Sequence, residues 1–272
     1  MQLGCGLFES TIKAKAKLSG EDILSQHIDN LKFIKIEGIF YTIQHSIYLG
    51  FEGSYGFLGR GNLDQKVSWD SFNSQTCYLT KGKSADLGVQ FGYKFYLTPY
   101  HLNVTSLMPK FGYSGFFMDV EDKALRKTPT IAEGFSLDRS KGVLKQRWYG
   151  PFLGGALEIK TYQGFGVTLS YDYYFFSLIN NSFASFNFSD GSVLKLKSKK
   201  SYGGGYGHHP KASVSFDINN TLKFGASLNY LYFKEKSSST TVKNLTDHIP
   251  LNTSGSYQRE DLSVVLFMAL VF

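Results

Sequence analysis

Long runs of alternating apolar and polar residues constrain the fold of this chain more than any other feature. In 85–97 the apolar set is Ala85, Leu87, Val89, Phe91, Tyr93, Phe95 and Leu97, and the intervening set includes Asp86, Gly88, Gln90, Gly92 and Lys94. Successive side chains of a β-strand point to opposite faces, so this run predicts a strand with one apolar and one polar face. Similar runs occupy 46–58, 164–176, 221–233 and 262–272.

The length and polarity of these runs indicate strands that cross a membrane. Each covers about 11–13 residues, whereas a soluble strand typically has about five or six. Aromatic residues gather near the ends of the apolar faces, as in the girdles of transmembrane barrels. The chain has 18 Tyr, 24 Phe and 28 Gly but no apolar stretch of the length that a membrane helix needs. A soluble barrel or sandwich, with its apolar faces packed inward, is the alternative.

Short and long connections alternate along the chain, as they do in outer-membrane barrels. The short ones are 44–45, 161–164 and 219–220, and the long polar ones are 59–82, 119–145, 178–206 and 235–257. We therefore predict one domain over 1–272, an all-β, ten-stranded antiparallel transmembrane barrel with periplasmic termini and extracellular long loops. The 19–30 connection would be the fifth outer loop. The expected strands are 7–18, 31–43, 46–60, 83–97, 108–120, 145–159, 164–178, 207–218, 221–235 and 258–272.

The two ends of the chain bear on targeting. The first residues lack the basic segment and apolar run of a secretory signal peptide, so we expect the natural precursor to carry one. The last strand ends on Phe272, a feature that the barrel-assembly machinery reads in outer-membrane proteins. We expect that machinery to be a partner. Cys5 and Cys77 would lie at opposite rims, so no disulfide is expected.

Four segments resemble the omptins, which are ten-stranded outer-membrane aspartate proteases. The stretch from Ser46 to Gln65 resembles their third strand and first active-site segment. The stretch from Lys145 to Gly155 is similar to their Tyr-Lys-Gln…Pro-Tyr-Ile-Gly-Leu strand, and 86–90 with 110–115 resemble the strands between. The resemblance covers nearly the whole chain in element order. It implies an omptin-like barrel with its site at the outer rim.

The omptin catalytic residues are not preserved. The family places an Asp-x-Asp-Trp pair opposite an Asp-x-His pair to activate a water molecule. Here the first segment runs from Asp64 to Asp70, and neither alignment, on Asp64 or on Trp69, keeps both carboxylates of the family pair. In the second segment no His follows Asp190 until His208. We therefore expect no omptin-type catalytic site and lean toward a protein that is not an enzyme. Asp64, Asp70, Asp190 and His208 remain candidates for a hydrolase with a rearranged site.

The net charge of +7 indicates an anionic partner. Candidate lipid-binding or anion-binding residues in or beside the predicted outer loops are Lys145, Arg147, Lys195, Lys197, Lys199 and Lys200. Lipopolysaccharide phosphates would accept charge-assisted hydrogen bonds from them, and the omptin resemblance implies the same lipid. Solvated loop charges are the alternative. Nucleic-acid binding is not expected, because no matching fold signature accompanies the scattered basic residues.

Three functional classes stay open. The favoured one is a monomeric surface barrel with a structural, adhesive or lipopolysaccharide-contacting role, and the second is the rearranged hydrolase. The third is a narrow pore, in which inward charges would plug the lumen by pairing. Those charges are Lys13, Lys15, Lys17, Glu52, Asp86, Lys94, Glu158 and Asp172. No cofactor or metal is expected, since His208 and His209 have no further ligands in the pattern.

Overall fold

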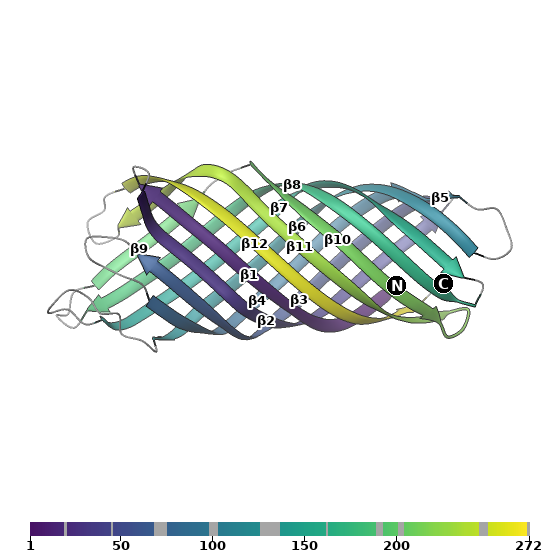
Figure 1. Cartoon of the computed structure of the whole chain (residues 1–272), viewed down its shortest axis with the longest axis horizontal. Coiled ribbons are helices and arrows are strands. Elements are labelled where there is room, and N and C mark those ends of the chain that lie inside the picture. Colours follow the sequence, from purple (N-terminus) through teal and green to yellow (C-terminus); the bar gives the residue numbers. More distant parts are fainter. Residues whose placement is uncertain are drawn as a thin grey trace.

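The described part of the chain consists of β-strands joined by turns (Figure 1). The computed structural model describes residues 1–18, 21–44, 46–67, 75–97, 103–125, 137–161, 163–188, 193–200, 204–244 and 250–270. Toward several strand ends it describes the backbone but not the side chains. None of these residues belongs to a helix long and apolar enough to span a bilayer.

Antiparallel pairing closes the sheet into a ten-stranded barrel, which confirms the predicted fold class. Around the barrel the order is β10-β11-β12-β1-β2-β3-β4-β6-β7-β8, and β8 pairs with β10 to close it. The short β9 pairs with β8 and β11, so β9 and β10 share one position, while β5 pairs only with β6. The strands are β1 Gln2–Leu18, β2 Glu21–Gln44, β3 Ile47–Val67, β4 Gln75–Tyr93, β5 Phe95–Tyr96, β6 Asn103–Leu125, β7 Leu137–Thr161, β8 Phe165–Phe188, β9 Val193–Lys200, β10 Gly204–Asp217, β11 Leu222–Asn244 and β12 Pro250–Leu270.

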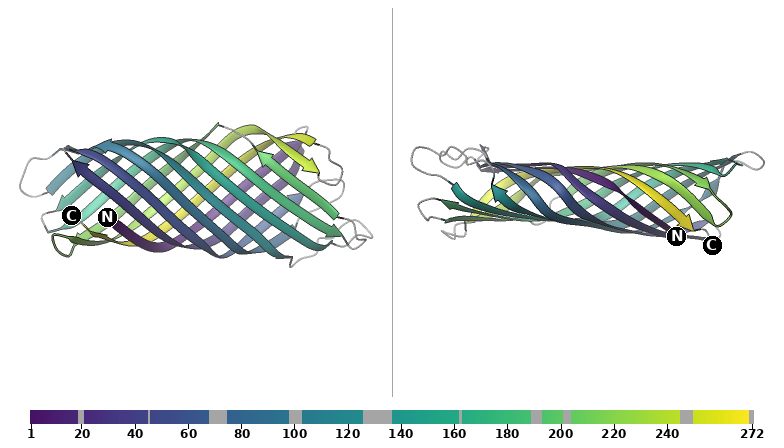
Figure 2. Two further views of the ribbon diagram at one scale, coloured as in Figure 1. Left: turned by 180° about the vertical axis from the view of Figure 1, so that it is seen from behind. Right: turned by 90° about the horizontal axis from the view of Figure 1, so that it is seen from below.

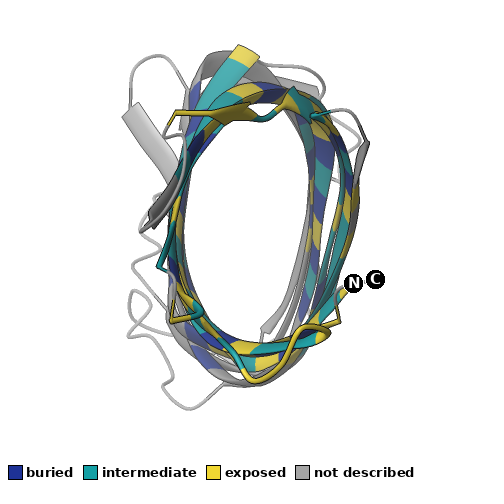
Figure 3. Cartoon of the chain, turned by 90° about the vertical axis from the view of Figure 1, so that its right-hand side faces the viewer, coloured by how far each residue is buried: buried dark blue, intermediate teal, exposed yellow. Residues whose placement is uncertain are grey.

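The two ends of the barrel differ. The three predicted short turns are confirmed, and they lie at the same end as both chain termini, which we term the turn end (Figure 1). At one of them Gly164 has a φ of 80°, a conformation that glycine adopts without strain. The opposite end is termed the loop end. The barrel is also flattened. Its cross-section is oval (Figure 3), and its two side views differ in width (Figure 2).

The long polar segments are largely strands, which corrects the predicted boundaries. β2 begins at Glu21, so the predicted 19–30 loop is wrong. In the same way β3 runs to Val67 and β11 to Asn244, well beyond their predicted ends. The ladder continues because its hydrogen bonds are made by the backbone. Apolar alternation predicts a strand only as far as its outward face stays apolar, so the predicted strands are too short.

In the half of the barrel next to the turn end, the turn half, the outer surface is apolar. Along β12 Leu262, Val264, Leu266, Met268 and Leu270 are exposed, whereas Val265, Phe267 and Ala269 between them are buried. This confirms the predicted faces of the last strand, although Phe272 lies outside the described residues. Since each exposed set faces away from the lumen, this outer surface is suited to contact lipid.

In the other half, the loop half, the polarity is reversed. The exposed set of β1 changes from Leu3, Cys5 and Leu7 to Glu9, Lys13 and Lys15, with the half-buried Thr11 on the same face, while Ile12 is completely buried. The prediction that Lys13 and Lys15 face the lumen is therefore wrong, and the side chain of Lys17 lies outside the described ones. The physical reason is the surrounding medium: charged groups on the outer surface are favourable once the strand has left the lipid.

The interior of the loop half is mainly a hydrophobic core, within which the buried Arg259 pairs with Asp261 on the same strand. Side chains from seven strands form the core: Phe8, Ile12, Ile28, Leu31, Phe33, Phe116, Met118, Val120, Trp148, Phe152, Tyr174, Leu231, Phe233 and Tyr257. A soluble barrel has the same arrangement of polarity. The chain is thus a membrane barrel in one half and resembles a water-surrounded barrel in the other.

Candidate functional site

A cavity of about 450 Å³ occupies the lumen of the turn half. Gln2, Lys94 and Lys223, which lie near strand ends at the turn end, line one end of it. Phe116 and His209 line it where the hydrophobic core begins. The walls between are polar, because the lumenal residues of a transmembrane barrel alternate with lipid-facing ones.

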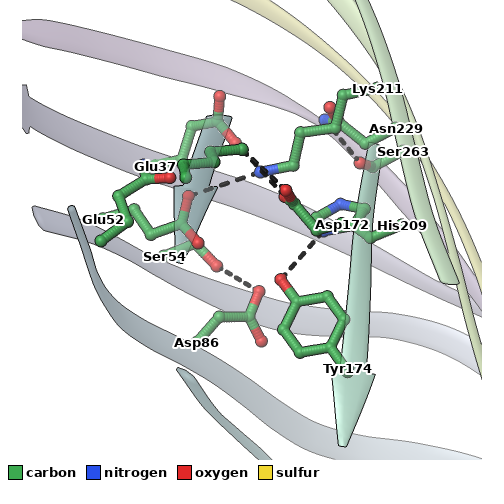
Figure 4. Close-up of polar contacts among 12 residues, drawn as sticks. Glu37, Glu52, Ser54, Asp86, Asp172, Tyr174, His209, Lys211, Asn229 and Ser263 are labelled. Atoms are coloured by element: carbon green, nitrogen blue, oxygen red, sulfur yellow. Dashed lines mark hydrogen bonds and ion pairs between the residues drawn. The ribbon is translucent and has the colours of Figure 1, made fainter. Parts of the chain in front are cut away.

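Ion pairs cross this lumen between strands that are not neighbours. Lys211 Nζ of β10 lies 3.4 Å from Glu52 Oε2 of β3 (Figure 4). These strands lie on opposite walls, because the strand order places four strands between them on either side. Lys94, which follows the end of β4, also pairs with Glu158 of β7. A carboxylate and an ammonium that meet in a lumen offset part of each other's desolvation cost. The pairs therefore hold the walls at a fixed separation.

Two further pairs lie in the same lumen. Lys110 Nζ lies 2.9 and 3.0 Å from the two carboxylate oxygens of Asp172. Lys35 Nζ lies 3.5 Å from Asp86 Oδ2, which also accepts a 2.7 Å hydrogen bond from Ser54 Oγ (Figure 4). The predicted pairing of Glu52, Asp86, Lys94, Glu158 and Asp172 inside the lumen is confirmed.

The cationic partners Lys35, Lys110 and Lys211 were not identified from the sequence. The alternation of apolar and polar residues already indicates that each of these lysines points inward. It does not indicate which carboxylate each lysine meets, because that depends on the strand register: Glu52 and Lys211 are 159 residues apart in the chain.

An imidazole and a phenol lie at the inner end of the cavity. Tyr174 Oη lies 3.3 Å from His209 Nδ1, and both side chains are buried (Figure 4). His209 is thus the lumenal member of the adjacent histidine pair. His208 faces the other way, with its Nδ1 2.5 Å from the hydroxyl of the exposed Tyr171. The two histidines occupy opposite faces of β10 and cannot form one ligand pair.

Aromatic rings from opposite walls meet beside the cavity. We term Phe116, Trp148, Tyr174, Phe233 and Tyr257 the aromatic layer. The ring centroids are 4.9 Å apart for Trp148 and Phe233, 4.7 Å for Trp148 and Tyr257, and 5.0 Å for Phe116 and Phe233. Trp148 is on β7 and Tyr257 on β12, which three strands separate on one side of the barrel and five on the other. The layer therefore crosses the lumen.

The structure does not bring the hydrolase candidates to His208. The register pairs His208 with Tyr173 of β8, and this strand then runs on to Phe188, a path of about 50 Å at the usual rise of a strand. Asp190 comes two residues later and lies outside the described residues, as does Asp70. His208 is accordingly far from Phe188, where the described part of β8 ends.

Asp64 has a different histidine as its neighbour. In the β2–β3 ladder its register partner is His27, which sequence reasoning missed because the two lie on separate strands. His27 faces away from the lumen, since Ile28 beside it is buried in the hydrophobic core. The side chain of Asp64 is outside the described ones. A rim-facing set of catalytic groups is thus not assembled among the described side chains.

The basic candidates occupy the loop half. Lys145 and Arg147 are exposed on the outer face of β7, and the register sets Arg147 beside the lipid-facing ring of Phe117. The lysines at 195, 197, 199 and 200 lie on β9, whose backbone pairs with β8 and β11 and whose side chains are outside the described ones. Other exposed cations on the outer face are Lys13, Lys15, Lys32, Lys83 and Lys234.

The described residues contain no group of three or more His, Cys, Asp or Glu side chains that could hold a metal ion. Cys5 is a free, exposed thiol on the outer face of β1. The lumenal ion pairs, the buried phenol and the imidazole form a polar interior that is suited to structural pairing. None of these described groups is arranged as a nucleophile with its base and orienting group.

Comparisons with known proteins agree with this architecture. A family model described as Protochlamydia outer membrane protein matches residues 9–264. Among solved structures, the outer membrane protease OmpT from Escherichia coli superposes with a TM-score of 0.69 at 14% identity, covering 99% of this chain and 96% of that one. The outer membrane protein OprG from Pseudomonas aeruginosa matches with a TM-score of 0.33 at 12% identity over 98% and 96% of the two chains. A search of curated proteins by sequence found no match.

The similarity to OmpT confirms the omptin-like fold and, at this identity, the fold alone. Together with the family match it identifies the chain as an outer-membrane β-barrel.

Proposed function

Because the chain belongs to the Protochlamydia outer membrane protein family, we propose that it is a non-proteolytic surface barrel that holds lipopolysaccharide-type lipid. Its binding surface is the basic belt, which we define as the exposed outward cations of the loop half. These are Lys13, Lys15, Lys32, Lys83, Lys145, Arg147 and Lys234. The belt borders the apolar surface of the turn half, where lipid headgroups would lie.

The observation that supports this proposal best is the surface around Lys145 and Arg147. Arg147 is the register partner of the exposed Phe117. Lys145 is the register partner of Asp119, and on the other side Asp119 is the register partner of Lys83. A guanidinium and an ammonium that lie just beyond a row of lipid-facing rings can donate charge-assisted hydrogen bonds to phosphate while the rings contact acyl chains.

The direct test measures how lipopolysaccharide stabilises the purified barrel in detergent. The rise in melting temperature with lipid concentration gives an apparent Kd, because a ligand that binds the folded state stabilises it by mass action. We expect Lys145→Gln/Arg147→Gln to weaken binding about a hundredfold, since each charge-assisted hydrogen bond contributes about 1.5 kcal/mol or more.

The matched control is Lys160→Gln/Lys223→Gln, which removes two cations at the turn end, where both pair with Asp217. It should bind lipopolysaccharide as the wild type does. Equal binding by the belt variant and the wild type would refute the proposal, and so would equal stabilisation by a lipid without phosphate.

This function requires a defined orientation, with the loop end outside the cell and the turn end in the periplasm. An epitope inserted between Asn219 and Asn220 should then be inaccessible to antibody on intact cells, whereas one inserted in 126–136 should be accessible. The reverse labelling pattern would contradict the orientation. In this placement the turn-end side of β12 would contact the barrel-assembly machinery from the periplasm, with Phe272 as the recognised residue.

A peptidase is the second candidate, and one register pair favours it. Asp64 and His27 are partners on neighbouring strands in the loop half, and a carboxylate beside an imidazole can activate water. The fold is also similar to that of a protein described as an outer membrane protease. Basic peptides should be incubated with the barrel and lipopolysaccharide. Cleavage that is lost in both Asp64→Asn and His27→Gln would replace the non-enzymatic proposal, and absence of cleavage would dismiss the peptidase.

A further inference from the structure

The interior of the barrel changes character abruptly along its length. The cavity of the turn half is lined by ion pairs, serines and amides, and it includes Ser106, Ser213 and Asn229. At Phe116 it meets the aromatic layer, whose rings belong to β6, β7, β8, β11 and β12. Water and ions are stable beside the first set of groups and unfavourable among the second.

The aromatic layer joins walls that lie far apart around the barrel. Phe116 of β6 contacts Phe233 of β11 at a centroid distance of 5.0 Å, and Tyr174 of β8 contacts the same ring at 5.7 Å. Trp148 stacks on Phe233 at an interplanar angle of 20°. Trp148 and Phe233 are both completely buried, so neither solvent nor the cavity reaches these two rings.

Aliphatic side chains thicken this barrier toward the loop end. Ile12, Ile28, Leu31, Met118 and Val120 belong to the same hydrophobic cluster, and each is at most 1% exposed. Hydrophobic constrictions of this kind stop ion flow because water does not wet them. The flattened cross-section explains how side chains from opposite walls can meet (Figure 3).

We propose that the aromatic layer is a hydrophobic seal that makes the lumen a blind polar vestibule, open at the turn end and closed at the loop end. In this arrangement the barrel does not conduct ions, although its membrane-embedded half contains a polar passage. The Glu52–Lys211 pair spans the vestibule and lies in the path that ions would follow if the seal were removed. The inference is independent of whether the belt binds lipopolysaccharide.

The experiment records single-barrel conductance in planar bilayers. The wild type should give no resolved conductance steps, and Trp148→Ala/Phe233→Ala should raise the conductance at least about tenfold above the wild-type background. The matched control is Phe91→Ala/Phe111→Ala, which removes a ring pair stacked at 5.7 Å on the lipid-facing surface. This control should remain as silent as the wild type.

Folding of each variant is verified by its heat-dependent mobility in electrophoresis, and the single variants Trp148→Ala and Phe233→Ala serve if the double variant does not fold. Steady conductance of the wild type overturns the proposal by itself, whatever the variants do. It is also overturned if the folded double variant stays silent, or if the lipid-facing control conducts as much as the double variant.

A second arm locates the ion path. In the opened Trp148→Ala/Phe233→Ala barrel, adding Glu52→Gln removes a negative charge from the vestibule and should shift the ion preference toward anions. Adding Lys211→Met should shift it toward cations. Unchanged selectivity in both variants would mean that ions bypass the vestibule, and this also contradicts the seal.

Discussion

The turn half and the loop half of this barrel are built from the same ten strands with opposite polarity. In the turn half Leu87 and Phe111 face outward while Asp172 and Lys110 are buried inside. In the loop half Lys13 and Lys145 face outward while most of the interior is a hydrophobic core, with one buried ion pair between Arg259 and Asp261. Because the backbone ladders are alike in both halves, the difference shows that the surrounding medium, lipid or water, decides which face of a strand is apolar.

The two interiors are also stabilised differently. In the turn half, charges bring opposite walls together through pairs such as Glu52 with Lys211. In the loop half, ring contacts such as Trp148 with Phe233 perform the same task. Substitutions inside and outside each half should therefore have distinct costs, and these costs can support or contradict the comparison.

The largest effect is expected from breaking a buried ion pair in the turn half. Lys110→Met leaves Asp172, which is 2% exposed, without its cationic partner and should cost about 3–5 kcal/mol. The double variant Lys110→Met/Asp172→Leu should recover most of that loss, because neither charge of this pair is left buried without its partner. Urea unfolding in lipid vesicles measures both. A single variant as stable as Lys234→Met, an exposed-lysine control on the outer face, would show that the lumenal charges do not depend on pairing.

A somewhat smaller loss is expected from truncating a ring inside the loop half. Phe233→Ala removes a completely buried ring that touches Phe116, Trp148 and Tyr174, and it should cost about 3–4 kcal/mol through lost transfer and a residual cavity. The comparison variant is Phe111→Ala, whose ring is 57% exposed on the lipid-facing surface. It should cost about 2 kcal/mol, since lipid fills the space and no cavity forms. Equal losses in equilibrium unfolding would contradict a packed core in the loop half.

The smallest effects of this set separate the two outer surfaces. Leu87→Lys introduces a charge on the lipid-facing surface of β4, where Leu87 is 62% exposed, and should cost about 2–4 kcal/mol. Thr11→Lys places the same side chain on the outer face of β1 in the loop half and should change stability by less than about 0.5 kcal/mol. If both positions tolerated lysine equally, the apolar surface of the turn half would not be in lipid.

The sequence predicted the turn half well and the loop half poorly, for a physical reason. Alternation in 85–97 and 262–270 identifies lipid-facing positions because lipid requires every outward residue to be apolar. The same rule predicts that Lys13 faces the lumen, but in the structure Lys13 is exposed on the outer face and the adjacent Ile12 is buried in the core. Periodicity shows that two faces exist, but the medium outside each stretch determines which of them points outward.

The lumenal contacts required the register of the closed barrel. The alternation placed Glu52 and Asp172 inside, and the idea that inward charges neutralise one another was confirmed. Their partners could not be identified from spacing, because Lys211 reaches Glu52 only when ten strands close into a ring. The aromatic layer could not be predicted for the same reason. Nothing in the sequence pattern indicates that Trp148 of β7 and Phe233 of β11 contact each other across one narrow lumen.

The measurement that tests the central claim most directly is a cysteine scan along β1 in bilayers, in a background with Cys5→Ser and Cys77→Ser. A spin label at position 3 or 7 should be relaxed by oxygen, which concentrates in lipid. A label at 11 or 13 should be relaxed by a water-soluble nickel complex, and a label at 12 should be reached by neither. This pattern would place the change of polarity between Leu7 and Thr11. A label that is relaxed by oxygen at 12 and protected from nickel at 13 would restore the opposite face assignment and contradict the account.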